Sequence, residues 1–163
     1  MSNPTTRPDA LPPLKLWGGI EPTINRVQDQ YMSQDTRTHH SQRIKDLDQF
    51  ASLGIKTMRY PVLWEATAPE GVASANWAFA DERLPRLREL GIRPIVGLVH
   101  HGSGPRYTSL TDPEFPDKLA EYALAVATRF PWVKDWTPVN ETMTTAAFRA
   151  SMGCGTRTAR MIR

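Results

Sequence analysis

Three apolar segments of this sequence end on polar side chains, and they follow one another at intervals of about 40 residues. The segments and the side chains that follow them are 55–58 with Arg59, 94–99 with His100, and 136–139 with Asn140 and Glu141. Short apolar runs of this kind are typical of buried parallel strands. In parallel α/β proteins, functional groups gather at the carboxyl ends of the strands. We therefore expect these polar residues to meet at one rim of a barrel.

A short repeat marks the junctions between helices and strands. Leu53-Gly54-Ile55 and Leu90-Gly91-Ile92 lie 37 residues apart, and a glycine at such a place ends a helix in the left-handed conformation. The apolar spacing predicts strands at 15–20, 55–60, 92–99 and 133–141, a loop at 21–26, and helices at 41–53, at 77–90 and from Asp112-Pro113-Glu114 onward. Pro85 predicts a kink or a later start of the second helix.

The predicted units amount to half of a TIM barrel. A complete (β/α)8 barrel has eight strands and about 250 residues, whereas this sequence predicts four strands. The fold class is therefore α/β, with about four βα units from the N-terminal half of a barrel at residues 15–148. Residues 1–14, which hold four prolines, are expected to be a flexible leader. Residues 149–163 carry four arginines and no acid, and we expect a basic tail that is non-native or disordered.

Composition argues against a nucleic-acid-binding protein and against a membrane protein. The net charge of +3 comes from the arginines of residues 149–163, so the rest of the chain is not basic and nucleic acid is not an expected partner. No run approaches the roughly 18 apolar residues of a membrane span, and the N-terminus lacks an apolar signal core. The one cysteine, Cys154, gives no basis for a disulfide. These features predict a cytoplasmic protein with no membrane partner.

Asn140 and Glu141 form the pair best suited to chemistry. A carboxyl can exchange a proton with a leaving oxygen, and an amide beside it can hold a substrate hydroxyl. An isolated Asn-Glu pair is more often part of a solvated loop, and only its place at the end of a strand favours the acid/base interpretation. Glu141 is therefore the candidate catalytic residue.

Arg59 and the two histidines after the third strand are further candidates. Arg59 can orient a carboxylate or hold it ionised, although a surface arginine would also fit the pattern. His100 can donate to a sugar hydroxyl, and His101 could equally be the residue that faces the ligand, since successive strand residues face opposite ways. No Cys or His cluster with ligand spacing accompanies them. We expect no metal and no cofactor.

Four motifs occur together in an order and spacing that resemble a known enzyme family. They are Leu16-Trp17-Gly18-Gly19, Met58-Arg59-Tyr60-Pro61 with Leu63-Trp64, Val99-His100-His101, and Trp136-Thr137-Pro138-Val139-Asn140-Glu141. Over about residues 15–148 they resemble glycoside hydrolase family 1 and, more broadly, clan A of the retaining glycosidases. The resemblance implies that Glu141 is the general acid/base and that Arg59, His100 and Asn140 line the sugar subsite. Asn25 or Glu21 would take the place of a sugar-binding glutamine.

The same resemblance implies that the second catalytic carboxylate is missing. The family carries its nucleophile on strand seven, and a retaining mechanism needs both carboxylates. We expect a fragment that is inactive alone, with a small carbohydrate or glycoside and the C-terminal half-barrel as partners. Whether the chain is itself an enzyme stays open.

Three departures from the family leave other functions open. His101 and Thr142 stand where the family has tryptophan and proline, and Tyr60-Pro61 stands where it has a Phe-Ser pair. These departures resemble a divergent branch joined to dTDP-4-dehydrorhamnose reductase-type domains. One alternative is thus a non-catalytic sugar-binding or scaffold module of a sugar-nucleotide biosynthetic protein. Another is a hydrolase of glycoside hydrolase family 5, which also places Asn-Glu after the fourth strand.

Overall fold

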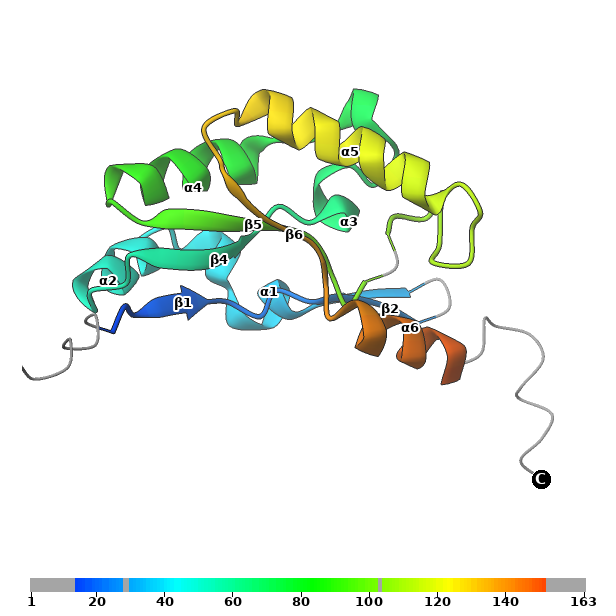
Figure 1. Cartoon of the computed structure of the whole chain (residues 1–163), viewed down its shortest axis with the longest axis horizontal. Helices are drawn as coiled ribbons and strands as arrows, with labels where there is room; N and C mark the ends of the chain where they lie inside the picture. Colours follow the sequence, from blue (N-terminus) through cyan, green and yellow to red (C-terminus); the bar gives the residue numbers. More distant parts are fainter. Residues whose placement is uncertain (1–13, 28–29, 103, 152–163) are drawn as a thin grey trace, which may run out of the picture.

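The computed structural model describes residues 14–27, 30–102 and 104–151, which form a parallel sheet with helices packed against it (Figure 1). The sheet has the order β1-β4-β5-β6, and all three pairings are parallel. Its strands are β1 (Trp17–Gly19), β4 (Thr57–Pro61), β5 (Arg93–His100) and β6 (Asp135–Asn140). The four predicted strands and their parallel arrangement are therefore confirmed.

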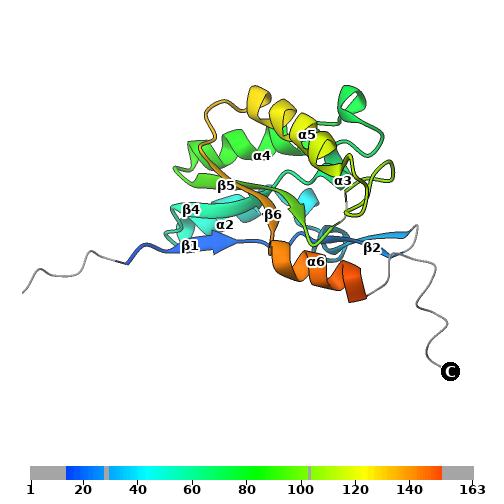
Figure 2. The same cartoon turned by 45° about the vertical axis from the view of Figure 1, so that its right-hand side comes forward.

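Helices connect each strand to the next. The longer connecting helices are α2 (Asp46–Ser52), α4 (Ala78–Glu89) and α5 (Phe115–Arg129). The short ones are α1 (Gln34–Thr38), η1 (His40–Gln42), α3 (Trp64–Thr67) and η2 (Val72–Ser74), and α6 (Thr142–Ser151) follows the last strand. Figures 1 and 2 show α4 and α5 side by side on one face of the sheet. This alternation of strand and helix is the pattern of a partial (β/α)8 barrel.

The core lies between that face of the sheet and its helices. Leu84 and Leu87 of α4 and Tyr122 and Val126 of α5 are fully buried. The indole of Trp64, also buried, stacks on Tyr122 with ring centroids 5.8 Å apart. Burial of these apolar side chains fixes the helices on the sheet, so the polar residues at the strand ends are held on a rigid frame.

The glycines of the Leu-Gly-Ile repeat behave as predicted. Gly54 and Gly91 have φ angles of 80° and 69°, and each follows a helix directly before the next strand. A side chain at this left-handed conformation would be strained. These glycines therefore end α2 and α4 and turn the chain into β4 and β5.

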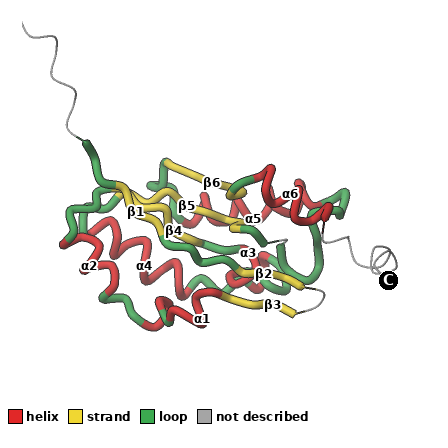
Figure 3. The backbone as a smooth tube through the Cα atoms, turned by 90° about the horizontal axis from the view of Figure 1, so that it is seen from below, coloured by secondary structure: helices red, strands yellow, loops and turns green. Residues whose placement is uncertain are grey.

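Residues 21–26, predicted as a loop, instead lead into a hairpin. β2 (Ile24–Val27) and β3 (Gln30–Ser33) pair antiparallel in a separate two-stranded sheet. Figure 3 shows this hairpin and α6 at the same end of the molecule, beyond the carboxyl ends of the parallel strands. The prediction failed because Asn25 and Arg26 interrupt the apolar alternation by which a strand is recognised.

Two helix boundaries also differ from the predictions. The helix expected at 41–53 is divided into η1 and a shorter α2. The helix expected from Asp112 begins at Phe115 with Pro116 in its first turn, because Asp112 accepts a hydrogen bond from the Glu114 N–H at 2.9 Å and forms a turn instead. Pro85 lies inside α4, which begins at Ala78, so no later start occurs.

The ends of the chain are described only in part. The predicted leader lies outside the described residues except for Leu14, and most of the predicted tail lies outside them from residue 152 onward. α6 continues to Ser151, three residues into that tail. Among the helices of the described residues, none has the length and apolar content needed to cross a membrane.

Candidate active site

The polar residues at the strand ends form one connected cluster. Glu21 follows β1, Arg59 lies in β4, His100 ends β5, and Asn140 ends β6 with Glu141 directly after it. His100 and Asn140 are opposite each other in the register of β5 and β6. The structure therefore brings the three predicted polar clusters to one rim of the sheet.

Arg59 joins the first and the fourth strand of the sheet. Its Nη1 donates to Asn140 Oδ1 at 2.6 Å, and its Nη2 donates to Glu21 Oε1 at 3.2 Å. In the register of the sheet, Arg59 is opposite Ile95 of β5, whereas Asn140 is opposite His100 at the end of that strand. The Arg59 side chain therefore crosses β5 diagonally, toward its carboxyl end. Arg59 thus fixes the amide of Asn140 and holds the Glu21 carboxylate by opposite charge.

His100 is buried and is held on both sides. Its Nδ1 lies 2.9 Å from Thr23 Oγ1, and its Nε2 lies 3.2 Å from Glu21 Oε2 without the alignment of a hydrogen bond. Burial lowers the pKa of His100, and the negative charge of Glu21 opposes that shift. The ring is therefore neutral at pH 7, with one nitrogen as donor and the other as acceptor. A neutral imidazole can either donate a hydrogen bond to a hydroxyl or accept one from it.

Glu141 and His101 share an unusual backbone conformation. Their φ angles are 46° and 55°, in the left-handed region that residues other than glycine rarely adopt. The Glu141 side chain is 57% exposed, and its Oε2 lies 3.7 Å from His101 Nε2. His101 Nε2 is also 3.2 Å from Asn140 Nδ2. Local strain of this kind is concentrated at functional sites, and here it occurs at the ends of the two strands that carry the candidate residues.

Asn25, the sixth predicted site residue, lies outside this cluster. It is exposed in β2, opposite Met32 of the hairpin. Of the two candidates for one role, Glu21 is the residue that contacts Arg59 and His100. The sequence left the two open, and the position of Glu21 two residues after Gly19 is the signal that could have distinguished it.

Two further residues contribute to the cluster, and of these only Thr23 was not considered in the sequence analysis. Thr23 contacts His100, and only its place two residues after Glu21 could have indicated it. His101 was left as an alternative to His100, and both lie in the cluster. Within the described residues, no group of three or more His, Cys, Asp or Glu side chains is placed to hold a metal ion.

Known proteins resemble this chain in sequence. The sequence profile of glycosyl hydrolase family 1 matches residues 16–156. β-Glucosidase A of Thermotoga maritima is 26% identical over 136 residues, which are 78% of this chain and 30% of that protein. β-Glucosidase 6 of Oryza sativa subsp. japonica is 26% identical over 140 residues, which are 80% of this chain and 27% of that protein. The chain thus spans less than a third of these relatives.

Solved structures resemble the fold. The β-glucosidase from Thermotoga maritima in complex with deoxynojirimycin superposes with a TM-score of 0.59 at 27% identity, covering 66% of this chain and 26% of that one. The same enzyme with galacto-hydroximolactam gives a TM-score of 0.60 at 26% identity, over 71% of this chain and 29% of that one. These neighbours are TIM barrels, so the parallel sheet described here is part of such a barrel. The chain belongs to glycosyl hydrolase family 1.

Proposed function

We propose that this chain carries the acid/base half of a retaining β-glycosidase site and is inactive alone. The observation that carries the proposal is the connected cluster at the rim, in which Arg59 joins Glu21 to Asn140 and Glu141 lies next to that amide. Its substrate would be a small carbohydrate or glycoside. The Thermotoga maritima relative binds compounds such as glucoimidazole and deoxynojirimycin, which supports this substrate class.

The roles follow from the chemistry of each group. Glu141 protonates the glycosidic oxygen as the bond breaks, and afterwards takes a proton from the attacking water. Asn140 and His100 hold sugar hydroxyls, and Arg59 orients the Glu21 carboxylate through their ion pair. Asn25 and Glu21 are the candidates for a further hydroxyl contact. In this proposal no group of the described residues acts as the nucleophile, because the family carries that carboxylate on strand seven.

The second carboxylate would come from strands that follow those of this chain. A retaining site needs two carboxyl groups about 5–5.5 Å apart on opposite sides of the scissile bond. The C-terminal half-barrel is therefore the proposed partner, either as a longer polypeptide or as a separate one. The domain limits that go with this proposal are residues 15–148 for the half-barrel, with residues 1–14 and 149–163 outside it.

Hydrolysis assays test both parts of the proposal. The chain alone is expected to release no nitrophenol from 4-nitrophenyl β-glucoside, because it lacks the nucleophile. A hybrid that joins it to the part of the Thermotoga maritima enzyme that it does not cover is expected to hydrolyse the substrate. In that hybrid, Glu141→Gln should lower kcat by a factor of about 100 or more, as loss of a general acid does.

The matched control is Glu121→Gln, which removes a carboxylate from the exposed side of α5 and should leave kcat unchanged. If the chain alone hydrolyses the substrate and Glu141→Ala abolishes this activity, then the proposed dependence on a partner is wrong. If the hybrid is active and Glu141→Gln has no effect, then the acid/base role is wrong.

A specific contact favours a second candidate function. Glu141 Oε2 lies 3.7 Å from His101 Nε2, a residue that stands where the family has tryptophan, and this pairing would suit a carboxylate that neither transfers protons nor contacts the sugar. The candidate is a non-catalytic sugar-binding module of a sugar-nucleotide protein of the dTDP-rhamnose type. It predicts that the hybrid binds glucose derivatives without hydrolysis, and that Glu141→Gln leaves their affinity unchanged.

A further inference from the structure

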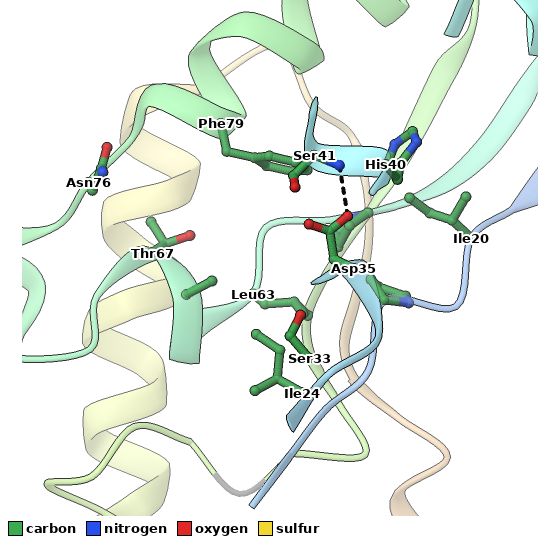
Figure 4. Close-up of a pocket in the computed structure, with 13 residues that line it drawn as sticks. Ile20, Ile24, Ser33, Asp35, His40, Ser41, Leu63, Thr67, Asn76 and Phe79 are labelled. Atoms are coloured by element: carbon green, nitrogen blue, oxygen red, sulfur yellow. Dashed lines mark hydrogen bonds between the residues drawn. The ribbon is translucent and has the colours of Figure 1, made fainter. Parts of the chain in front are cut away.

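A cavity of about 210 Å³ lies beside the candidate active site and is separate from it. Figure 4 shows its walls, which come from the segment after β1, from β2 and β3, from α1 and η1, and from α3 and α4. Ile24, Leu63 and Phe79 supply apolar surface, and Asp35 supplies a carboxylate. Ile20 and Pro22 also line it, and Glu21 between them points to Arg59 and His100 instead. The two sites therefore share one stretch of backbone.

Asp35 is the ionised group that faces this cavity. Its Oδ1 accepts a hydrogen bond from the Ser41 N–H at 2.8 Å, and its carboxylate is turned into the cavity in Figure 4. The neighbouring His40 has both ring nitrogens engaged, with Nδ1 2.8 Å from Asp46 Oδ2 and Nε2 2.9 Å from the Tyr60 hydroxyl. His40 is thus part of the wall. Asp35 makes no ion pair with a cation of the described residues.

The other carboxylates around Asp35 are paired with arginines. A second cavity, of about 260 Å³, shares Asp35 and His40 with the first and is also lined by Glu21, Asp46 and Arg43. Arg43 is paired with Asp46, and Arg59 is paired with Glu21. Arg83, which lies over the Phe79 ring and donates to Ser41 O, is paired with Glu82. Asp35 is therefore the carboxylate lining these cavities that has no ion pair among the described residues. A partly enclosed site of this kind concentrates the field of its charges. A positively charged ligand is favoured there.

We propose that the cavity at Asp35 binds a small organic cation, with a primary ammonium group on a compact apolar body. The ammonium donates to the free oxygen of the Asp35 carboxylate, and the body lies against Ile24, Leu63 and Phe79. A charge-assisted hydrogen bond supplies the specificity, and burial of the apolar body supplies the rest of the affinity. The proposal does not depend on the glycosidase function, because none of these four residues belongs to the candidate active site.

Amide chemical shifts of the isotopically labelled 163-residue chain test the proposal. The probes are cyclohexylamine, which is a cation at pH 7, cyclohexanol, which has a similar shape without charge, and methylamine, which has the charge without the body. Cyclohexylamine should shift the amides of Ser41 and Thr67 in a saturable way. Cyclohexanol and methylamine should bind at least about tenfold more weakly, since each lacks one of the two contributions.

Two variants separate the roles of charge and space. Asp35→Asn keeps an acceptor for the Ser41 N–H and removes the charge, and it should weaken cyclohexylamine binding by about tenfold or more. Ala66→Leu, at an exposed position of α3 that lines the cavity, should weaken all three probes. The control Asp117→Asn removes an exposed carboxylate of α5 and should change nothing.

The outcomes that would overturn the proposal are equally specific. Equal affinities for cyclohexylamine and cyclohexanol, or unchanged affinity in Asp35→Asn, would show that the carboxylate does not select a cation. Shifts confined to His100 and Asn140 would place the ligand at the candidate active site. An absence of saturable shifts in the folded wild-type chain would exclude the site. The dispersion of each variant's amide spectrum establishes in the same experiment that the variant is folded.

Discussion

Arg59 is the residue on which the geometry of the rim most depends. One guanidinium contacts the segment after β1 and the end of β6, so it spans the width of the sheet. Asn140, which accepts the shorter of the two bonds, is buried. A hydrogen bond from a charged donor to a buried amide is stronger than an exposed ion pair.

Arg59→Met is therefore expected to lower the free energy of unfolding by about 1.5–3 kcal/mol, the usual contribution of a hydrogen bond to a charged group. Urea denaturation followed by tryptophan fluorescence measures the change. The control is Arg93→Met, in which an arginine that is 55% exposed loses its ion pair with Asp135 at a cost of about 1 kcal/mol or less. If both variants lower the free energy of unfolding equally, then the bond from Arg59 to Asn140 contributes no more than an exposed ion pair.

The sequence predicted the residues of the rim better than their contacts. His100, Asn140 and Glu141 end or directly follow a strand, and strand direction brings such residues together. Arg59 lies in the middle of β4 and reaches them through its long side chain. The bond between Arg59 and Asn140 could not be predicted, because Arg59 is opposite Ile95 and Asn140 is opposite His100, so the bond crosses β5 diagonally. Contacts across a neighbouring strand depend on register and side-chain size, and neither has a local sequence signal.

At the scale of the element, the start of α5 depends on Asp112. This carboxylate accepts from the Glu114 N–H and lies 2.8 Å from Lys118 Nζ and from Thr108 Oγ1. The bond from Lys118, followed by those from Glu114 and Thr108, lowers the pKa of Asp112 to about 2 from its ordinary 3.8. A carboxyl with a lowered pKa stabilises the fold above its unfolded pKa, and this contribution is lost as the pH falls through the folded value.

Asp112→Asn should accordingly reduce the acid dependence of stability. In the wild-type chain, protonation of Asp112 contributes to the loss of stability between pH 3.8 and about 2. The asparagine still accepts from the Glu114 N–H but cannot titrate, so the variant's urea midpoint should be lower near pH 6 and should change less over the acid range. If the urea midpoint of Asp112→Asn falls with decreasing pH as steeply as that of the wild type, this prediction is wrong. Asp117→Asn, in the first turn of α5, is the control.

Two exposed prolines have opposite places in their helices. Pro85 lies in the middle of α4, where it removes a backbone donor, and Pro116 lies in the first turn of α5, where no donor is needed. Pro85→Ala should raise the free energy of unfolding by about 1–3 kcal/mol, and Pro116→Ala should leave it the same or lower. Thermal and urea unfolding measure both variants. If only Pro116→Ala raises the free energy of unfolding, then Pro85 does not destabilise α4.

The sequence predicted some helices and strands and missed others, and the difference has a physical cause. The parallel strands and α4 were predicted because burial imposes apolar spacing on them. The hairpin of β2 and β3 was missed, since Arg26 is held by carbonyls of a distant loop, at 2.9 Å from Thr108 O, and not by a local pattern. Tertiary contacts of this kind decide the structure where local preference is weak.

At the scale of the whole molecule, the parallel sheet has two edges. β1 pairs only with β4 and β6 only with β5 within the described residues, and in a complete barrel each edge would have a neighbour. Trp17 on β1 is 58% exposed, and Leu16 before it is 54% exposed. An edge strand with exposed apolar side chains is a template for pairing with another chain. The half-barrel is thus expected to associate with itself when its partner strands are absent.

Trp17→Lys should reduce that association, because a lysine on an edge strand opposes pairing with a second strand. Sedimentation velocity at increasing protein concentration should show a larger species for the wild type and a monomer for the variant. Leu124→Lys is the matched control, since Leu124 is 69% exposed on α5, away from either edge, and its variant should associate as the wild type does. If Leu124→Lys abolishes association and Trp17→Lys does not, then the helical face and not the sheet edge is the contact surface. If both variants associate as the wild type does, then β1 is not the edge that pairs, and the same substitution at Trp136 of β6 becomes the deciding variant.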